Sequence, residues 1–368
     1  MITVKAPGKL YIAGEYAVVE PGHPAILIAV DQFIQVQAHL QSHFSSAWSD
    51  QSPAGELEWH HNGNQVEFSP FDRRFSYVAS AIQTTEEYLR AQAVPIRNYH
   101  LKITSELDSD NGQKYGLGSS AAVTVAVVKA ICKVVGYHVD LITIFKLAAI
   151  AHLSVQGNGS LGDVAASVYQ GWIAYQSFDR KWLLNHLAHH TIADTVAIEW
   201  PHLKIEALNP PAELQVLIGW TGRPASTAHL VGKVANKRVD ESTFYNHFLT
   251  ASNECVNKMI QAFRNHDLQS IQEQIHHNRQ LLVALANHTN VNIETPQLKQ
   301  MCDIVNQLGG AAKSSGAGGG DCGIAIVNHQ TDLKQIIARW HQFAIDKLPL
   351  RVSYNQQEES HDQPSFTS

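Results

Sequence analysis

Two glycines and two serines near the middle of the chain form the segment best suited to chemistry. Residues 115–126 read YGLGSSAAVTVA, so a glycine turn leads into two hydroxyls and then into an apolar, helix-like run. Gly116 and Gly118 allow positive φ and a close approach of the backbone to a ligand. Ser119 and Ser120 stand where a helix would begin, with its unpaired N–H groups and the positive end of its dipole. This pattern is typical of a phosphate-binding turn. A glycine turn with a serine N-cap before a core helix accounts for the same residues.

Other residues with chemical potential lie near further glycine-rich segments. Residues 5–16 read KAPGKLYIAGEY and contain Lys9, and residues 313–321 read KSSGAGGGD. A glycine turn at residues 157–162 directly precedes Asp163. Taken alone, Lys9 is a solvated charge on a strand, and Asp163 is an N-cap of the helix that follows it. The individual segments therefore leave a structural and a catalytic interpretation open.

The composition limits the classes of partner. The chain has 368 residues, 44% of them hydrophobic, with 23 glycines and 13 prolines, which is typical of a globular protein with two domains. Its formal net charge of −6 argues against nucleic acids and anionic membranes as partners. Any phosphate must therefore be held by local charge. No apolar run approaches the roughly 20 residues that span a bilayer, and the N-terminal residues lack a signal-peptide pattern.

Cysteines and histidines do not predict a metal site. The four cysteines are scattered without metal-ligand spacing, so we expect reduced thiols and a cytoplasmic location. None of the 21 histidines forms an HxxxH pair next to an acidic ligand, and exposed polar side chains are the simpler interpretation.

The elements that must position these residues follow from periodicity and from turn residues. We predict helices over residues 76–91, 119–135, 140–153, 241–264, 268–287 and 295–308. We predict strands over residues 2–4, 25–30, 33–38, 100–104, 172–177, 214–220 and 322–327. Residues 41–76 are polar and predict hairpins and loops. The proline-containing stretch between residues 177 and 214 is predicted to connect two domains, and the polar residues 355–368 to be disordered.

The three glycine-rich segments together, in this order, closely resemble the three signature motifs of the GHMP kinases, and the resemblance extends over nearly the whole chain. It implies an α+β protein with the GHMP kinase fold. A ribosomal-S5-like α/β domain with a left-handed βαβ unit would occupy residues 1–205, and a ferredoxin-like α/β domain residues 206–354. The active site would lie between these domains.

Within the family, residues 9–31 (KLYIAGEYAVVEPGHPAILIAVD), 162–165 (GDVA) and 219–227 (GWTGRPAST) are most similar to the phosphomevalonate kinases of Gram-positive bacteria. That resemblance implies transfer of the ATP γ-phosphate to (R)-5-phosphomevalonate, with Mg²⁺, in a monomer or homodimer of the mevalonate route. A mevalonate kinase is one alternative; Tyr16, where many mevalonate kinases have a histidine, favours the phosphorylated substrate. A catalytically silent ligand-binding protein is another, but it would be expected to lose Lys9, Ser120 or Asp163.

The resemblance also implies roles for individual residues. Lys9 matches the active-site lysine, and Ser120 matches the serine whose hydroxyl is a ligand of the magnesium ion. The residues expected to bind the ATP phosphates are Lys114, Gly116, Leu117, Gly118, Ser119, Ser120 and Ala121. The residues expected on the side of the acceptor, where Lys114 is a further candidate, are Arg223, Ser226, Thr227, Ser315, Gly316, Ala317 and Gly318. Surface charge, a helix cap and a tight turn are the structural alternatives for these acceptor-side residues.

Two positions depart from a simple transfer of family roles. Asp163 matches the general base of mevalonate kinases, but a phosphate acceptor is already anionic near pH 7 because its second pKa is about 6. We therefore assign Asp163 to orienting Lys9 and to positioning magnesium or substrate, with base catalysis secondary. His152 stands eleven residues before Asp163, where some relatives place an acidic magnesium ligand, and imidazole is a poor ligand for that ion. Glu15, in the first motif, is predicted to be structural.

Overall fold

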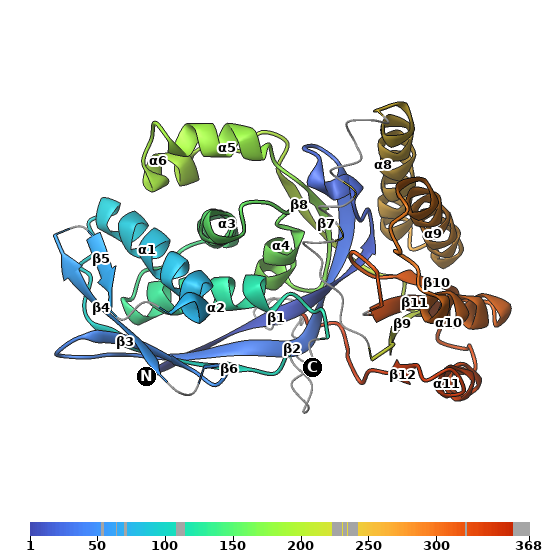
Figure 1. The fold of residues 1–368 in the computed structure, drawn as a ribbon, viewed down its shortest axis with the longest axis horizontal. Helices are drawn as coiled ribbons and strands as arrows, with labels where there is room; N and C mark the ends of the chain where they lie inside the picture. Colours follow the sequence, from blue (N-terminus) through green and yellow to red (C-terminus); the bar gives the residue numbers. More distant parts are fainter. Residues whose placement is uncertain are drawn as a thin grey trace, which may run out of the picture.

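The computed structural model describes residues 1–52, 55–63, 65–69, 72–107, 115–222, 230, 234, 242–320 and 322–355. Four predicted site residues, Lys114, Arg223, Ser226 and Thr227, lie outside these ranges, as do residues 356–368 of the predicted disordered tail. Within these ranges the chain forms two β-sheets, each covered by its own helices, which lie next to each other (Figure 1).

The first sheet is centred on one long strand. Its order is β5-β4-β3-β6-β2-β7-β8, with β1 also paired to β2. Residues 24–30 of β2 are buried without interruption, whereas buried and partly exposed residues alternate from 33 to 38. The continuous run is typical of a strand covered on both faces, and the alternation of a strand covered on one. The strands are β1 (Ile2–Ala13), β2 (Pro24–Leu40), β3 (Ser45–Ser49), β4 (Glu56–Asn62), β5 (Gln65–Phe68), β6 (Tyr99–Ser105), β7 (Trp172–Gln176) and β8 (Lys204–Leu208).

Helices cover one face of this sheet (Figure 1). They are α1 (Ser76–Ala91), α2 (Ser119–Val134), α3 (Leu141–Gln156) and α4 (Gly162–Tyr169), with α5 (Arg180–Leu187) and α6 (Ile192–Ala197) farther out and the short 3₁₀ turns η1 (Ala17–Val19) and η2 (Arg73–Phe75). Strands β3 and β6 are parallel, and α1 lies between them in the chain, so they form a βαβ unit. The left hand expected for such a unit stays a prediction.

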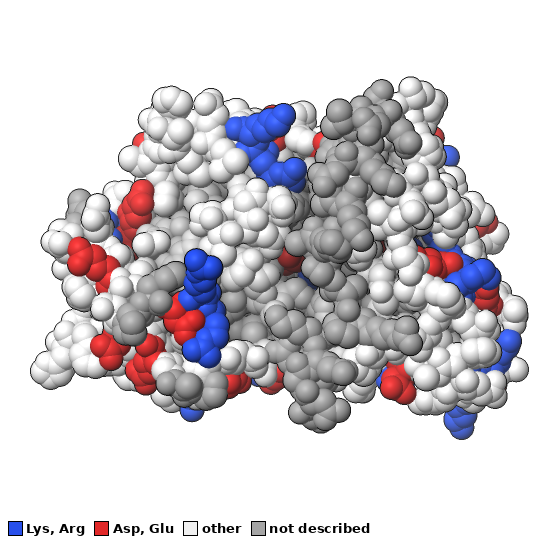
Figure 2. Space-filling model, in the orientation of Figure 1, with Lys and Arg blue, Asp and Glu red and all other residues white. Residues whose placement is uncertain are grey.

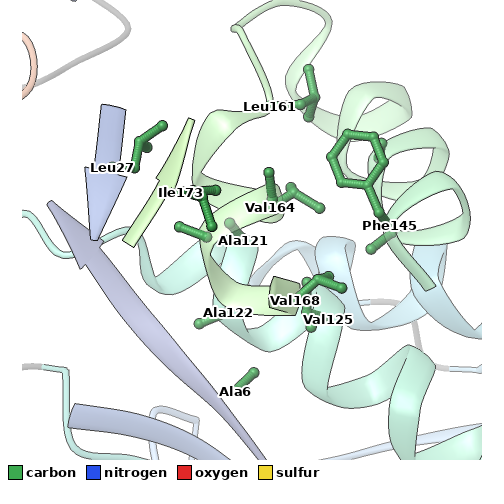
Figure 3. Close-up of a cluster of buried hydrophobic side chains, with 14 of the residues drawn as sticks. Ala6, Leu27, Ala121, Ala122, Val125, Phe145, Leu161, Val164, Val168 and Ile173 are labelled. Atoms are coloured by element: carbon green, nitrogen blue, oxygen red, sulfur yellow. The ribbon is translucent and has the colours of Figure 1, made fainter. Parts of the chain in front are cut away.

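The helices that begin at the two central glycine turns pack against each other. Ala121 and Val125 of α2 lie beside Val164 and Val168 of α4 in a buried cluster (Figure 3). All four side chains are fully buried, so the contact removes apolar surface from water and fixes the two helices relative to each other. The first turn of α2 and the first turn of α4 are thereby held close together.

The second sheet is antiparallel, with the order β10-β11-β9-β12. Its strands are β9 (Leu214–Trp220), β10 (Ala311–Ser314), β11 (Cys322–Asn328) and β12 (Asp346–Lys347). Its helices are α8 (Ser242–Arg264), α9 (Leu268–Thr289), α10 (Pro296–Gln307) and α11 (Leu333–His341). Helix α8 also contacts β2 and β8, and α9 contacts β1. Val352 forms a bridge with Val30, so the described chain ends at the first sheet.

The prediction of an inter-domain connection between residues 177 and 214 was wrong for most of that stretch. It forms α5, α6 and β8, and β8 pairs with β7 of the first sheet. Asp179 caps α5, and Thr191 forms a capping box with Asp194 in α6. Such caps start helices too short to show a clear apolar period. The chain passes between the sheets after Leu208, and the predicted boundary at residues 205 and 206 falls inside β8.

The long periodic elements were predicted well. Residues 76–91 and 214–220 have the predicted bounds, as α1 and β9, whereas α11 was not predicted. All four cysteines are buried thiols that form no disulfide. In the part of the chain that the structure describes, no helix combines the length and apolar character needed to span a bilayer.

Candidate active site

Lys9 joins the first sheet to the central glycine loop. Its backbone N–H donates to the carbonyl of Leu117 at 2.8 Å, and its ammonium donates to the carbonyl of Gly116 at 3.2 Å. The ammonium also lies over the ring of Tyr11, 5.6 Å from the centroid. The lysine is therefore held through its backbone and through its ammonium group, and its charge lies next to the carbonyl of Gly116.

The loop itself requires glycine. Gly116 and Gly118 have φ of 74° and 82°, a region that favours glycine. A Cβ on Gly118 would lie 3.1 Å from Cε of Lys9 and 3.6 Å from Cβ of Asp163. Both predicted catalytic residues thus lie against the same side of Gly118, where a side chain would stand. Helix α2 starts at the next residue, Ser119, so its first N–H groups lie where the sequence predicted an anion-binding helix end, and that role stays a prediction.

Asp163 lies in the first turn of α4. The N-cap of that helix is Leu161, with φ of 62°, so the sequence-based alternative that Asp163 is itself the cap does not apply. One carboxylate oxygen of Asp163 accepts from the backbone N–H of Val164 at 3.0 Å. Burial raises the pKa of Tyr11 well above its usual range, and the nearby Asp163 charge adds to this effect. Asp163, Tyr11 and Lys9 therefore share one environment.

Ser120 contacts a residue of another helix. Its hydroxyl lies 3.2 Å from Nε2 of His152 on α3. The ring of Tyr77 on α1 lies 4.9 Å from the ring of His152. His152 is 1% exposed, and burial lowers its pKa although the Asp163 charge acts in the opposite direction. Gly118, not Ser120, is the N-cap of α2, so the hydroxyl is not a helix cap.

The third glycine-rich segment is bound to the first one. The hydroxyl of Ser315 accepts from the N–H of Tyr11 at 3.0 Å and donates to the carbonyl of Tyr11 at 2.9 Å. The hydroxyl of Tyr16 donates to the carbonyl of Ala317 at 2.6 Å. Burial, followed by the Glu15 charge, raises the pKa of Tyr16 far above its usual range, so this donor stays neutral.

A buried ion pair completes this connection. The ammonium of Lys313 contacts a carboxylate oxygen of Glu15, and their side chains are 0% and 2% exposed. Lys313 also donates to the carbonyl of Ser314 at 2.7 Å. This contact agrees with the structural role predicted for Glu15. Lys313 was missed as a partner, although a charge in an otherwise apolar strand is itself a signal that a buried counter-charge exists.

Strand β9 ends next to the central glycine loop. The ring of Trp220 meets the ring of Tyr115 edge-on, with centroids 5.1 Å apart. The thiol of Cys322, at the start of β11, donates to the carbonyl of Tyr115 at 3.4 Å. Residues from both sheets therefore meet at the start of the central loop.

Charge around the site is local. Basic and acidic side chains are scattered over the face shown in Figure 2, singly or in small mixed groups. In the described part of the chain, no group of three or more His, Cys, Asp or Glu side chains could hold a metal ion. A polyanion would thus be bound by Lys9 and by backbone N–H groups, and a divalent ion would have to arrive with it.

Comparison with known proteins agrees with this geometry. Residues 76–171 match the model of the GHMP kinases N terminal domain, and residues 259–346 match that of the GHMP kinases C terminal domain. A phosphomevalonate kinase from Streptomyces sp. (strain CL190) is 39% identical over 360 residues, covering 94% of this chain and 95% of the relative. The chain belongs to the GHMP kinase family.

Solved structures and more distant relatives extend the comparison. The structure of Streptococcus pneumoniae phosphomevalonate kinase in complex with phosphomevalonate and AMPPNP superposes with a TM-score of 0.84 at 31% identity, covering 96% of this chain and 100% of that chain. A mevalonate kinase from Pyrococcus furiosus is 27% identical over 91% of this chain and 92% of the relative. The similarity is thus higher to the kinase of the phosphorylated substrate.

Proposed function

We propose that this GHMP kinase transfers the γ-phosphoryl group of ATP to (R)-5-phosphomevalonate. An oxygen of the acceptor phosphate attacks the γ-phosphorus, the bond to the β,γ-bridging oxygen breaks, and ADP and (R)-5-diphosphomevalonate form. The observation that carries the proposal is the placement of Lys9 and Asp163 together against Gly118 of the central glycine loop. The complex of the Streptococcus pneumoniae relative with phosphomevalonate and AMPPNP supports both substrates.

Lys9 supplies the positive charge at the transferred group. Phosphoryl transfer needs positioning and charge neutralisation more than covalent help, because charge spreads over the phosphoryl oxygens in the transition state. The Lys9 ammonium is already directed to the loop by its bond to the Gly116 carbonyl, so little reorganisation is needed. The N–H groups of residues 116–121 would hold the ATP phosphates.

Asp163 acts as a positioning residue rather than as an obligatory base. The acceptor phosphate is largely dianionic above pH 6, so its attacking oxygen has no proton to lose. Asp163 instead keeps the Lys9 ammonium in place and helps to position the acceptor. Asp163→Ala is therefore expected to lower kcat while the affinity for ATP is largely retained.

A magnesium ion that arrives with ATP fits the donor atoms at the site. Ser120 lies 3.2 Å from Nε2 of His152, and the charge of Asp163 acts on the pKa of the same ring, so the two offer hydroxyl and carboxylate oxygens, which Mg²⁺ prefers, in one region. Mg²⁺ commonly keeps phosphate oxygens and waters as its other ligands, so these two side chains suffice. When bound, the ion reduces the charge on the phosphate oxygens. His152 is engaged with Ser120 and is not needed as a ligand.

The acceptor phosphate requires its own cations. Arg223, Ser226, Thr227 and Lys114 remain our candidates. Ser315, Gly316, Ala317 and Gly318 would border both substrates. Four buried cysteines that form no disulfide suit a reducing compartment, so we also infer a cytoplasmic location.

A coupled ADP-release assay tests the function. With ATP and Mg²⁺ present, we expect turnover with 5-phosphomevalonate and little with mevalonate. Turnover with mevalonate but not with 5-phosphomevalonate would indicate a mevalonate kinase. Nucleotide binding without turnover of either acceptor would indicate a ligand-binding protein instead.

A further inference from the structure

Tyr11 of β1 contacts three other parts of the candidate site. Its backbone N–H and carbonyl are bound by the hydroxyl of Ser315, in the third glycine-rich segment, at 3.0 and 2.9 Å. Its side-chain hydroxyl lies 2.8 Å from Oγ of Ser160, in the glycine turn that precedes Asp163. The ammonium of Lys9 lies over its ring, 5.6 Å from the centroid. Tyr11 is therefore held at its backbone and at the end of its side chain, with Lys9 against its ring.

The contact between Lys9 and the Tyr11 ring follows from the strand. Residues 9, 10 and 11 pair in unbroken register with residues 29, 28 and 27 of β2. Side chains two residues apart on a strand lie on the same face, so Lys9 and Tyr11 project from one face of β1. An ammonium over an aromatic ring is attracted by the negative charge of its face. The ring thus favours the position in which the ammonium also donates to the Gly116 carbonyl.

The glycine turn before Asp163 holds the ring in place. Ser160 is itself held twice, because its Oγ accepts from the N–H of Gly162 at 3.3 Å and its carbonyl accepts from the hydroxyl of Tyr175 at 2.6 Å. Gly162 leaves space for the Tyr11 hydroxyl, since a Cβ there would lie 2.7 Å from that oxygen. Burial, and after it the charge of Asp163, raises the pKa of Tyr11 far above its usual range, so the hydroxyl stays neutral. The ring is thus attached to a part of the chain that is itself fixed.

We propose that Tyr11 is a positioning residue for Lys9: its ring keeps the ammonium at the central glycine loop, and its hydroxyl, in contact with Ser160, keeps the ring under the ammonium. The turn that leads into Asp163 thereby also sets the place of Lys9. Without the hydroxyl the ring can tilt, and the ammonium then spends less time where the phosphoryl group is transferred. This inference rests on the proposed function, because that function makes Lys9 catalytic.

A structural role alone would be to join β1 to helix α4 and the turn before it. The structure makes that connection a second time, because the buried hydroxyl of Ser167, on α4, donates to the carbonyl of Pro7, on β1, at 2.7 Å. Ser167→Ala is therefore a matched control. It removes one hydroxyl and one hydrogen bond between α4 and β1, and it leaves Tyr11, Ser160 and Lys9 unchanged.

The first test measures kcat of the full chain with ATP and 5-phosphomevalonate. Tyr11→Phe removes only the hydroxyl and should lower kcat about three- to tenfold, which corresponds to the loss of one hydrogen bond. Tyr11→Leu also removes the aromatic face and should lower kcat about threefold further. KM for ATP should stay within about twofold, because the charge that Lys9 offsets develops in the transition state. Ser167→Ala should lower the urea midpoint but leave kcat within about twofold of the wild-type value.

A double variant shows whether the effect passes through Lys9. In a Lys9→Ala background, assayed with radiolabelled ATP, Tyr11→Phe should change kcat by less than about twofold, because the group that it positions is gone. A loss as large in this background as in the wild type would overturn the proposal. So would a wild-type kcat in Tyr11→Phe, or equal losses of kcat in Tyr11→Phe and Ser167→Ala. These outcomes decide the matter even if Tyr11→Leu does not fold.

A measurement without substrate separates this proposal from the proposed function. In protein labelled with ¹³C at the lysine ε-carbons, the Lys9 signal, assigned with Lys9→Arg, should show an upfield ring-current shift. This shift should become smaller in Tyr11→Phe, vanish in Tyr11→Leu and persist in Ser167→Ala. A Lys9 signal that is the same in wild type and in both Tyr11 variants would overturn the proposal. The expected signals in a protein that does not phosphorylate 5-phosphomevalonate would uphold the placement of Lys9 by Tyr11 and refute the proposed function alone.

Discussion

Two glycine-rich loops lie against β1, and they are held in opposite ways. The central loop, residues 115–120, contacts Lys9 through its own carbonyl groups, at Gly116 and Leu117. The third-motif loop, residues 313–320, is attached through side chains, namely the ion pair of Lys313 and the double hydrogen bond of Ser315. The first arrangement uses backbone carbonyl groups of the loop, and the second uses its polar side chains.

The difference separates a loop that we propose to bind an anion, residues 115–120, from a loop that connects the two sheets, residues 313–320, which we call the brace. Carbonyl groups of the central loop point to Lys9, so the N–H groups at the start of α2 remain for an anion. In the third-motif loop, the Ser315 hydroxyl is occupied by Tyr11 and the Ala317 carbonyl by Tyr16. Substitutions in the first region should therefore change catalysis, whereas substitutions in the second should change stability before they change chemistry.

The largest effect is expected at Lys9. Lys9→Ala removes the ammonium that offsets charge on the transferred phosphoryl group, and kcat should fall by at least about a hundredfold. The free energy of unfolding should change by less than about 1 kcal/mol, because the backbone bond to Leu117 is retained. Steady-state kinetics and urea unfolding measure the two quantities. A wild-type kcat in this variant would remove Lys9 from the catalytic residues.

Substitutions in the brace should lower the free energy of unfolding more than they lower kcat. Lys313→Met leaves the Glu15 carboxylate buried without its counter-charge and should lower the free energy of unfolding by about 3–5 kcal/mol. The double variant Glu15→Gln with Lys313→Met removes both charges and should regain part of that loss. If Lys313→Met unfolds like the wild type in urea, the ion pair is not a structural connection between the loops.

Two glycines of the third-motif loop allow a matched comparison. Gly316 and Gly318 have nearly the same φ, 71° and 72°, but a Cβ at Gly318 would lie 2.2 Å from the carbonyl oxygen of Ile293, whereas a Cβ at Gly316 meets nothing within 4 Å. Gly316→Ala carries only the cost of positive φ, about 1 kcal/mol. Gly318→Ala should cost at least about 1 kcal/mol more, measured by urea unfolding. Equal costs would mean that Ile293 does not confine this loop.

Motif residues were easier to predict than their partners. The sequence placed Lys9, Gly118 and Asp163 in one site because all three belong to segments whose order and spacing resemble one family, and the structure brings them together. The positions of α1 and β9 followed from long, regular apolar patterns. These are features in which many neighbouring residues carry the same signal.

Contacts between distant single residues carry no such signal. Glu15 and Lys313 are 298 positions apart, and only the packing of the two sheets brings them into contact. His152 was considered only as an unsuitable metal ligand, and Tyr77 only as part of a helix. The contacts of His152 with the Ser120 hydroxyl and with the Tyr77 ring depend on how α1, α2 and α3 cross, which apolar periodicity alone does not determine.

The smallest effect tests the brace at one hydroxyl. Tyr16→Phe removes the donor to the buried Ala317 carbonyl and should lower the free energy of unfolding by about 1–2 kcal/mol with little change in kcat.

The contribution of Tyr16 to stability should depend on pH. Its pKa is raised in the folded protein, so the folded state favours the neutral hydroxyl. As the pH rises above the pKa of the unfolded tyrosine, near 10, the unfolded state ionises first, and the contribution of Tyr16 to the free energy of unfolding falls. At pH 10.5 the unfolded tyrosine is mostly ionised. The difference between wild type and Tyr16→Phe should therefore be about 0.8 kcal/mol smaller at pH 10.5 than at pH 8. A difference that is independent of pH over this range would show that the Tyr16 hydroxyl is ionisable in the folded protein and is not a committed donor.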